Sequence, residues 1–434
     1  MDSYTIATIV LLGGFALMML VRIPVAFSLL LSAVFSALTC GQGLSTLVQQ
    51  MVKGIDNFTL LAIPFFIAMG EIMGEGGIST KIVDFANLLV GRFRGGLAYI
   101  NCLDSMFFGG ISGSAVADVS SLGSVVIPMM KEQGYDEDFA VGLTVVSSCQ
   151  GVLIPPSHNM VIYALAAGIG GSIGELFIAG VIPGIILGFS LMGLCYLMSG
   201  KYKFPRCEPI PKGQRLKILV NAFFPMLTLV IIMGGVALGI FTVTESAAIA
   251  CVYTFILTYV VFRSAPLKSL GKVLKNSLKT LAIVLTLIAA AKAFAYMMTL
   301  LRIPDALTSW LIGITSNKYL LLMIINALLI LLGCFMDMAP LILIMTPILL
   351  PVVTSPVIGM HPVQFGIMLI FNLAIGLCTP PVGSALFVGC AVGKTPIERT
   401  SVKILPMYAV MIGALILVTY VPQVSMWLVG VIFK

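Results

Sequence analysis

Runs of apolar residues long enough to cross a lipid bilayer recur along the whole chain. A membrane-spanning helix needs about 20 predominantly apolar residues. The clearest runs cover residues 5–21, 24–40, 59–74, 176–198, 217–238, 244–262, 280–300 and 404–430. Because lipid offers the backbone no hydrogen-bond partners, only helices and closed barrels can span it. Runs of this length predict an all-α integral membrane protein with many spans.

Composition excludes several other classes of protein. Charged residues make up 9% of the 434 residues, whereas a soluble globular protein carries about 25%. The net charge is +7, but the sequence shows no cluster of lysine and arginine residues with interleaved aromatic residues, which is typical of nucleic-acid binding. We therefore expect no nucleic-acid partner. The nine cysteines show neither a disulfide framework nor metal-ligand spacing. The N-terminus lacks the basic region and cleavage site of a signal peptide, so we interpret it as a retained first span.

The chain divides into two halves with matching interruptions. A polar connector, "SGKYKFPRCEPIPKGQR", covers residues 199–215, so we assign a first repeat to 1–199, a connector to 200–216 and a second repeat to 217–434. Each half contains an apolar segment interrupted by small residues and then one broken by a double proline: 97–130 and 138–168, then 320–353 and 363–393. Gly110 and Pro128 match Gly333 and Pro351 at an offset of 223, and Pro155-Pro156 matches Pro380-Pro381 at 225.

The placement of lysine and arginine sets an orientation. Under the positive-inside rule, the basic clusters on either side of the two spans from 217 to 262 are cytoplasmic. Both termini are then periplasmic. This arrangement requires 97–130 to enter and leave on the cytoplasmic side and 320–353 on the outer side. The two halves would therefore form an inverted repeat, as in many secondary transporters.

The interruptions suit ion and anion binding. We interpret 97–130 and 320–353 as re-entrant helical hairpins, with tips near Gly109–Ser114 and Gly333–Asp337. A double proline removes two backbone donors and frees carbonyl groups that suit Na⁺. The new helix N-terminus beyond each break suits a carboxylate. The alternative is that these breaks are ordinary kinks in membrane helices that bind no ligand. Their matched positions in the two halves favour a role in binding.

This arrangement resembles the large membrane subunit of TRAP (tripartite ATP-independent periplasmic) transporters over essentially the whole chain. The motifs that carry the resemblance are "GGISGSAVADVSSLG" at 109–123, "GVLIPPS" at 151–157, "CFMDMAPLILIMTPILLP" at 334–351 and "GLCTPPVG" at 376–383. It implies an elevator-type fold with inverted repeats, two re-entrant hairpins and two broken helices. It also implies Na⁺-coupled uptake of an organic acid, a periplasmic substrate-binding (P) protein and a separate small membrane (Q) subunit, in a bacterial inner membrane.

Carried onto this sequence, the resemblance implies two Na⁺ sites and no organic cofactor. The residues of the first site would be Ser112, Ser114, Gly151, Ile154 and Pro156. The residues of the second would be Gly333, Asp337, Gly376, Thr379 and Pro381. C4-dicarboxylates and sialic acid are among the substrates that the family implies.

Other polar residues have more than one interpretation. Ser157 and Asn159 are candidates for binding the substrate carboxylate or for local capping. Asp118 is a candidate for the substrate or Na⁺ sites, or for bracing the hairpin. Lys292 lies within a span, where it would pair with Glu71 or Asp337, extend to the membrane surface, or face a subunit. The stretch 41–58 is amphipathic and typical of a helix on the membrane surface.

Na⁺-coupled uptake of a small organic acid is the leading hypothesis. The main alternative is a cation-coupled carboxylate transporter or exchanger that works without a binding protein. A passive channel and an intramembrane enzyme are further alternatives. The enzyme hypothesis requires convergent catalytic groups, and the sequence carries neither an HExxH motif nor paired aspartates on facing spans. No glycine-lysine phosphate-binding motif is present to suggest that ATP drives transport directly.

Overall fold

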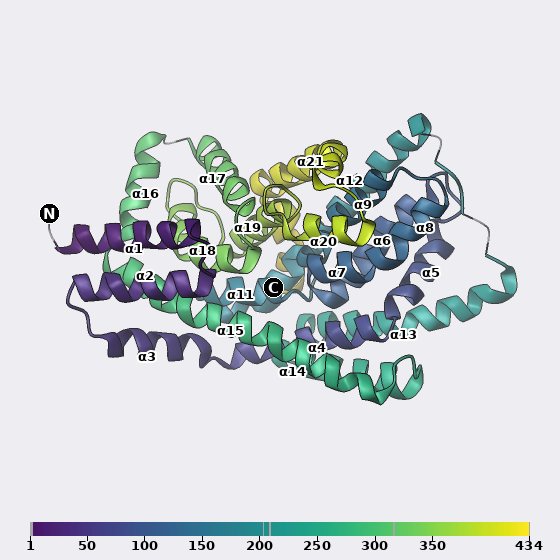
Figure 1. The fold of residues 1–434 in the computed structure, drawn as a ribbon, viewed down its shortest axis with the longest axis horizontal. Helices are drawn as coiled ribbons and strands as arrows, with labels where there is room; N and C mark the ends of the chain where they lie inside the picture. The colour runs from purple at the N-terminus through teal and green to yellow at the C-terminus, as the bar shows by residue number, and fades with distance from the viewer. Residues whose placement is uncertain (1–2, 203, 208–209, 316, 434) are drawn as a thin grey trace.

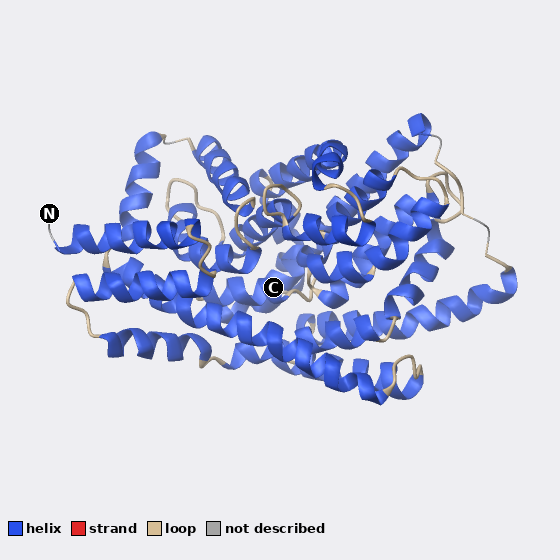
Figure 2. Cartoon of the chain, in the orientation of Figure 1, coloured by secondary structure: helices blue, strands red, loops and turns tan. Residues whose placement is uncertain are grey.

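The computed structural model describes residues 3–202, 204–207, 210–315 and 317–433, and over these residues it contains helices and no strands (Figures 1 and 2). Among these residues, seven helices are long and apolar enough to cross a membrane. An eighth candidate span is a helix pair, 137–153 and 158–166, bent by 51°. The predicted class, an all-α protein with many apolar spans, is therefore confirmed.

One group of helices forms an outer layer along the left and lower parts of Figure 1. Helix α15 lies at its centre and packs against α2, α3 and α4, while α1 packs on α2, and α14 packs on α4 and α13. The bounds are α1 Ser3–Leu20, α2 Val25–Thr39, α3 Leu44–Ile55, α4 Ala62–Glu75, α13 Lys212–Ala237, α14 Val243–Phe255 and α15 Leu270–Leu300. A 3-10 helix precedes α4 at Phe58–Leu61, a π-helical segment continues α14 at Ile256–Val261, and a second 3-10 helix precedes α15 at Leu267–Ser269.

A second group contains both interrupted segments and both broken helices. Its first-half members are α6 Gly96–Ser112, α7 Ala115–Ser121, α8 Gly123–Glu132, α9 Glu137–Ser148, α10 Gln150–Leu153, α11 His158–Ala166, a turn at Gly170–Ser172 and α12 Ile173–Tyr202. Its second-half members are α17 Lys318–Gly333, α18 Met338–Val353, α19 Pro362–Leu377, α20 Ser384–Gly393, α21 Ile397–Tyr420 and α22 Pro422–Ile432. Members from the two halves pack together: α9 contacts α20 and α21, and α12 contacts α19, α21 and α22.

Two helices connect the groups in equivalent ways. Helix α5, Ile78–Val90, packs between α6 and α13, and α16, Ile303–Ile314, packs against α18 and α15. The order of elements also repeats along the chain. Helix α5 begins 225 residues before α16, α9 begins 225 residues before α19, and α12 begins 224 residues before α21. The structure therefore repeats the interval of the double prolines at the level of whole helices.

Two boundaries differ from those predicted. The apolar run 404–430 does not form one span, because α21 ends at Tyr420 and Pro422 begins α22. Proline lacks a backbone N–H and is well tolerated only in the first turn of a helix. The prediction of one helix there was wrong, because Pro422 cannot donate the hydrogen bond that would continue α21 and instead begins a new helix. Gly109 and Gly110 also lie within α6 rather than in the turn, which is made by Gly113 with a φ of +64°.

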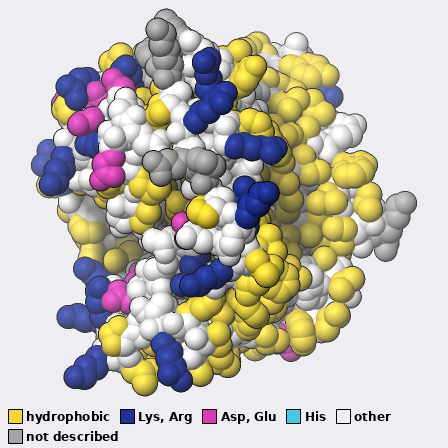
Figure 3. Space-filling view, turned by 90° about the vertical axis from the view of Figure 1, so that its right-hand side faces the viewer, with side chains coloured by type: hydrophobic (Ala, Val, Ile, Leu, Met, Phe, Trp, Pro, Cys, Tyr) yellow, Lys and Arg dark blue, Asp and Glu magenta, His cyan; other side chains and the backbone are white. Residues whose placement is uncertain are grey.

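Basic side chains gather at one end of the molecule, the right-hand end of Figure 1 (Figure 3). The α12–α13 and α14–α15 connections lie at this end, together with the turn between α8 and α9. Near that turn, ion pairs join the two halves of the chain: Arg399 with Asp138, and Lys403 with Asp136 at 3.2 Å. Lys131 Nζ also donates to the carbonyl oxygen of Gly393 at 2.6 Å. These contacts hold α8 and α9 to α20 and α21.

Candidate functional site

The first interrupted segment ends in a turn whose serines bond to one another. Ser114 caps α7, and its backbone N–H donates to Ser112 Oγ at 3.2 Å. The Ser112 hydroxyl donates to the carboxylate of Asp118 one helical turn further on. Ser112 and Asp118 are both buried. The predicted first-site serines thus lie together, with a carboxylate beside them.

The tip of this segment rests directly on the first double-proline break. A carbon atom built on Gly110 would lie 3.3 Å from the carbonyl oxygen of Pro155 and 3.1 Å from the side chain of Ile154. A carbon atom on Gly113 would meet the carbonyl oxygen of Pro156 and would lie 3.1 Å from the α carbon of Ser157. The break therefore presents its carbonyl groups to the tip.

Glycine allows the close approach between these two elements. A carbon atom on Gly109 would overlap the backbone of Gly151 and would lie 3.0 Å from Asp118 Oδ2. Asp118 Oδ2 is buried and has no hydrogen-bond partner among the described residues. A buried carboxylate oxygen without a donor is costly, and a cation beside it would remove that cost. Asp118 thus lies with the first-site residues.

The second interrupted segment meets the second break in a corresponding way. A carbon atom on Gly333 would lie 3.2 Å from the α carbon of Gly376, which matches the Gly109–Gly151 contact. The backbone N–H of Val382 donates to the carbonyl oxygen of Cys334 at 2.9 Å. Ser384 donates to the carboxylate of Asp337 at 3.2 Å. The structure therefore brings Gly333, Asp337 and the 376–384 break together.

The two tip–break units differ in access. Ser112, Gly151 and Pro156 are buried, whereas Asp337 and Pro381 are exposed in the isolated chain. Thr379 is half-buried, and its hydroxyl donates to the carbonyl oxygen of Ile375 at 2.7 Å, within its own helix end. Both double prolines contain a cis peptide bond. The first unit is closed to the surface and the second is open to it.

The helix that follows the first break begins with unused polar groups. Ser157 is the N-cap residue of α11, but its side chain makes no capping bond, and its buried Oγ has no partner among the described residues. Asn159 is buried in the first turn. Free N–H groups and the helix dipole favour an anion at such a terminus. The arrangement can accept a carboxylate beside the first tip.

The two broken helices cross at a pair of cysteines. Cys149 Sγ lies 3.0 Å from Cys378 Sγ. Each thiol also contacts the partner helix: Cys149 the carbonyl oxygen of Ala374 at 3.2 Å, and Cys378 that of Val145 at 3.5 Å. Each broken helix therefore contacts a backbone carbonyl group of the other near its break. The two candidate cation sites therefore flank one crossing point.

The sequence interpretation missed polar residues deeper in the first segment. Asp104 on α6 is fully buried, and neither carboxylate oxygen has a hydrogen-bond partner among the described residues. Asn101 donates to Thr144 at 2.7 Å, and Ser105 donates to Ser147 at 3.0 Å, which joins α6 to α9. An acid within an apolar segment was the available signal, since intramembrane carboxylates are rare.

Comparison with known proteins identifies close relatives. Residues 12–424 match the family described as "Tripartite ATP-independent periplasmic transporter, DctM component". The chain is 39% identical to the sialic acid TRAP transporter large permease protein SiaM of Vibrio cholerae, covering 93% of this chain and 94% of the relative. It is 35% identical to the C4-dicarboxylate TRAP transporter large permease protein DctM of Rhodobacter capsulatus, covering 97% and 98%. The crystal structure of the Alcanivorax borkumensis YdaH transporter has a similar fold, with a TM-score of 0.61, 14% identity and coverage of 87% and 88%.

Proposed function

The chain belongs to the DctM family of tripartite ATP-independent periplasmic transporters, and we propose that it is a Na⁺-coupled importer of a small organic acid. The family consists of transporter permeases rather than enzymes, and its relatives carry the names of sialic acid and C4-dicarboxylate systems. The chain is accordingly a multi-span membrane protein. A bacterial inner membrane is the proposed location, with both termini periplasmic.

The observation that carries this proposal is the pair of matched tip–break units. In each half, a glycine near the tip touches the glycine before the double proline, as Gly109 touches Gly151 and Gly333 touches Gly376. The carbonyl groups of Pro155 and Pro156 face the first tip. Oxygen atoms from hydroxyl, carboxylate and carbonyl groups suit a hard cation such as Na⁺.

Each unit would bind one Na⁺ as a co-transported ion. Ser112 and Asp118, together with carbonyl groups from 151–156, would bind the first. Asp337, together with carbonyl groups from 376–381, would bind the second. The buried Asp118 oxygen without a partner supports the first site. The substrate carboxylate would bind between them at the start of α11, where Ser157 Oγ lacks a partner and where both cations would offset its charge.

An elevator motion suits the arrangement of helices. The group that contains both breaks packs together across the two halves of the chain, and α5 and α16 link it to the outer layer. We propose that this group moves as a unit against the outer layer. Segments 97–130 and 320–353 act as re-entrant hairpins that close over the ions. Half-loaded states would move poorly because an uncompensated charge would have to cross the apolar barrier.

The proposed partners are those of the tripartite family. A periplasmic substrate-binding (P) protein would deliver the organic acid, and a small membrane (Q) subunit would extend the outer layer in contact with lipid. The surface of α1, α2 and α13 carries many exposed large apolar side chains, which suit lipid or a membrane subunit. A stand-alone carboxylate transporter without a binding protein is the alternative function.

Reconstitution tests the function directly. The chain and the proposed small subunit would be placed in proteoliposomes, with labelled N-acetylneuraminate and succinate as probes and with the proposed binding protein present or absent. We expect uptake in external Na⁺ that stops when choline replaces Na⁺. Uptake in choline would contradict Na⁺ coupling. Uptake that is equal without the binding protein would favour the stand-alone transporter.

A further inference from the structure

Lys292 has a partner that the sequence did not suggest. The other basic residues of α15 lie within its first ten positions, whereas Lys292 lies near the end of the helix. Its Nζ lies 3.4 Å from the carbonyl oxygen of Leu165. The acids considered as partners bond elsewhere: Glu71 accepts from Asn276 at 3.3 Å, and Asp337 accepts from Ser384. Lys292 therefore bonds to a helix end rather than to an acid.

The position of Lys292 is set by a glycine on a third helix. A carbon atom built on Gly54 of α3 would lie 2.5 Å from Lys292 Cγ and 2.9 Å from its Cβ. These are the first atoms of the side chain, so a larger residue at 54 would displace the whole lysine. Helices α3 and α15 pack together in the outer layer. Gly54 thus provides the space in which the Lys292 stem lies.

The carbonyl group that Lys292 contacts is at the C-terminal end of α11. That end has partial negative charge from unpaired carbonyl groups, and a cation there is favourable. Leu165 O also accepts from the N–H of Gly168 at 3.3 Å. A cavity of about 20 Å³ adjoins the contact and is lined by Ala166, Ala291, Lys292, Ala295, Leu343 and Pro347. The contact therefore links α11, in the group with both breaks, to the outer layer.

Helix α11 has only nine residues, so its two ends together fix its position. Its N-terminal end lies against the first tip, where Gly113 meets Ser157. We propose that Lys292 is a positioning residue for the substrate anion: in the conformation described, it holds the C-terminal end of α11 against the α3–α15 pair and so sets where the N-terminal end faces, and the contact opens when the group with both breaks moves. This inference rests on the proposed anion site at Ser157 and adds a residue on a different helix to it.

Crosslinking measures the contact without requiring transport. Ala166→Cys and Ala295→Cys place two thiols on the same small cavity, one in each half of the chain. A protease site inserted in the connector 199–215 lets the halves separate on a gel unless a short bifunctional thiol reagent has joined them. The chain with Ala166 and Ala295 intact gives the background from native cysteines.

Four variants and their controls then test the role of Lys292. Lys292→Met keeps a stem of similar volume and removes the charge, and we expect the crosslinked fraction to fall at least threefold. Gly54→Ala keeps the charge but displaces the stem, and the same decrease is expected. Lys292→Arg should keep the fraction within twofold of the parent. Combining Lys292→Met with Gly54→Ala should add little to either change. Lys279→Met and Gly271→Ala, on exposed positions of the same helix, should change nothing.

Uptake gives the second readout, with N-acetylneuraminate and succinate as probes. We expect Lys292→Met to raise KM at least fivefold while Vmax changes less than twofold, with rescue by arginine. An unchanged crosslinked fraction in Lys292→Met overturns the inference, as does an unchanged KM where uptake is Na⁺-dependent. A crosslinked fraction that depends on Lys292, in a protein that transports neither probe, supports the contact and counts against the proposed function instead.

Discussion

At the scale of single residues, the candidate site contains two of the buried oxygen atoms that lack a hydrogen-bond partner among the described residues. Asp118 Oδ2 and Ser157 Oγ are both buried, on either side of the contact between the first tip and the first break. Native proteins satisfy most buried polar groups, so such atoms call for a ligand. The two atoms differ in kind, because a carboxylate attracts a cation whereas a hydroxyl at a helix N-terminus donates to an anion. Their proximity is consistent with ion and substrate binding side by side.

Replacing Asp118 with asparagine tests the cation site. The amide keeps an oxygen that can accept from Ser112 but removes the negative charge. We expect the Na⁺ concentration for half-maximal uptake to rise about tenfold, which corresponds to about 1.4 kcal/mol. A Na⁺ titration of uptake measures it, with Asp305→Asn, at an exposed position on α16, as the control. An unchanged Na⁺ dependence in Asp118→Asn would remove this carboxylate from the site.

Arg399 on α21 binds the buried carboxylate of Asp138 in the first turn of α9. Asp138 is 4% exposed and bonds to Arg399 and, at 3.1 Å, to the hydroxyl of Thr400. Arg399→Ala removes the charged partner of this carboxylate, so we expect the free energy of unfolding to fall by about 1–3 kcal/mol, moderated because the arginine is mostly exposed. Thermal unfolding in detergent measures it. Adding Asp138→Asn should recover most of the loss, and failure to do so would show that the pair is not the cause.

At the scale of elements, glycine decides how closely the tips approach the breaks. Gly109 contacts Gly151 through α6 and α10, and Gly333 contacts Gly376 through α17 and α19. In the first segment, Gly113 supplies the positive φ of the turn. The other glycines at these contacts are required because a side chain would separate backbone from backbone. Loss of that contact would also move the carbonyl groups of the break away from the tip serines.

Alanine at either contact tests this packing. A carbon atom at Gly376 would lie 2.6 Å from the carbonyl carbon of Gly333, and one at Gly109 would overlap Gly151. We expect Gly109→Ala and Gly376→Ala each to lower stability by about 1–3 kcal/mol through overpacking and to reduce Na⁺-dependent uptake. Gly413→Ala, where no atom lies within 4 Å, should not be destabilising. Thermal unfolding in detergent together with uptake separates the two effects. If Gly109→Ala and Gly376→Ala both unfold at the wild-type temperature, these contacts tolerate a side chain.

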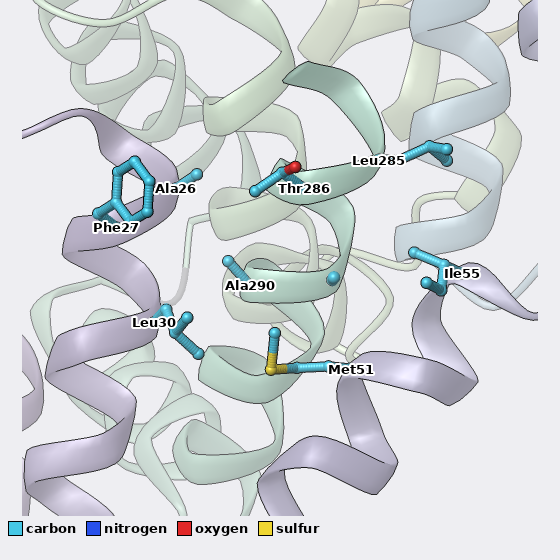
Figure 4. A pocket seen from close by; sticks show the side chains of 9 residues that line it. Ala26, Phe27, Leu30, Met51, Ile55, Leu285, Thr286 and Ala290 are labelled. Carbon is cyan, nitrogen blue, oxygen red and sulfur yellow. The ribbon is translucent and has the colours of Figure 1, made fainter. Parts of the chain in front are cut away.

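The outer layer contains a cavity whose lining is almost wholly apolar (Figure 4). It has a volume of about 260 Å³ and lies between α2, α3 and α15, where Phe27, Met51 and Leu285 contribute to its wall. Thr286 is its only polar residue. The cavity is separate from the tip–break units, so it belongs to the layer proposed to stay fixed rather than to the ion pathway.

At the scale of the whole molecule, the distribution of basic side chains and the division into two packing groups do not follow the same direction. Basic side chains gather at one end (Figure 3), whereas the two packing groups lie beside one another. The charge asymmetry sets orientation across the membrane. The division into groups determines which parts can move against each other. A transporter of the proposed type needs both properties.

Thiol labelling tests the proposed orientation. Gly213→Cys places a thiol in the basic α12–α13 region, and Thr354→Cys places one in the loop after α18, where the second segment returns. Under the predicted topology, a membrane-impermeant maleimide should label position 354 in intact spheroplasts. It should label position 213 only after permeabilisation. The parent chain gives the background of the native cysteines. The reverse pattern would invert the topology.

Much of the architecture followed from local sequence. Apolar runs predicted helices because lipid leaves the backbone no other partners. The double prolines marked the breaks at 154–157 and 378–383 because two adjacent residues without backbone donors end a helix. Pro422 also ends a helix, so the prediction of a single span over 404–430 was wrong. Asp104 is an acid within an apolar segment, as Asp118 is, but it lies within an uninterrupted helix, where no break in the sequence marks it.

Periodicity and composition by themselves determined that the chain crosses a membrane many times and that its halves repeat, because both properties depend on the order of residues along the chain. Only tertiary structure decided which atoms meet. The Lys292–Leu165 contact joins residues 127 positions apart, and the Cys149–Cys378 contact joins residues 229 positions apart. No local pattern encodes such a pairing, because it depends on how helices from both halves pack. The partner of a lone lysine in an apolar helix is therefore set by the fold.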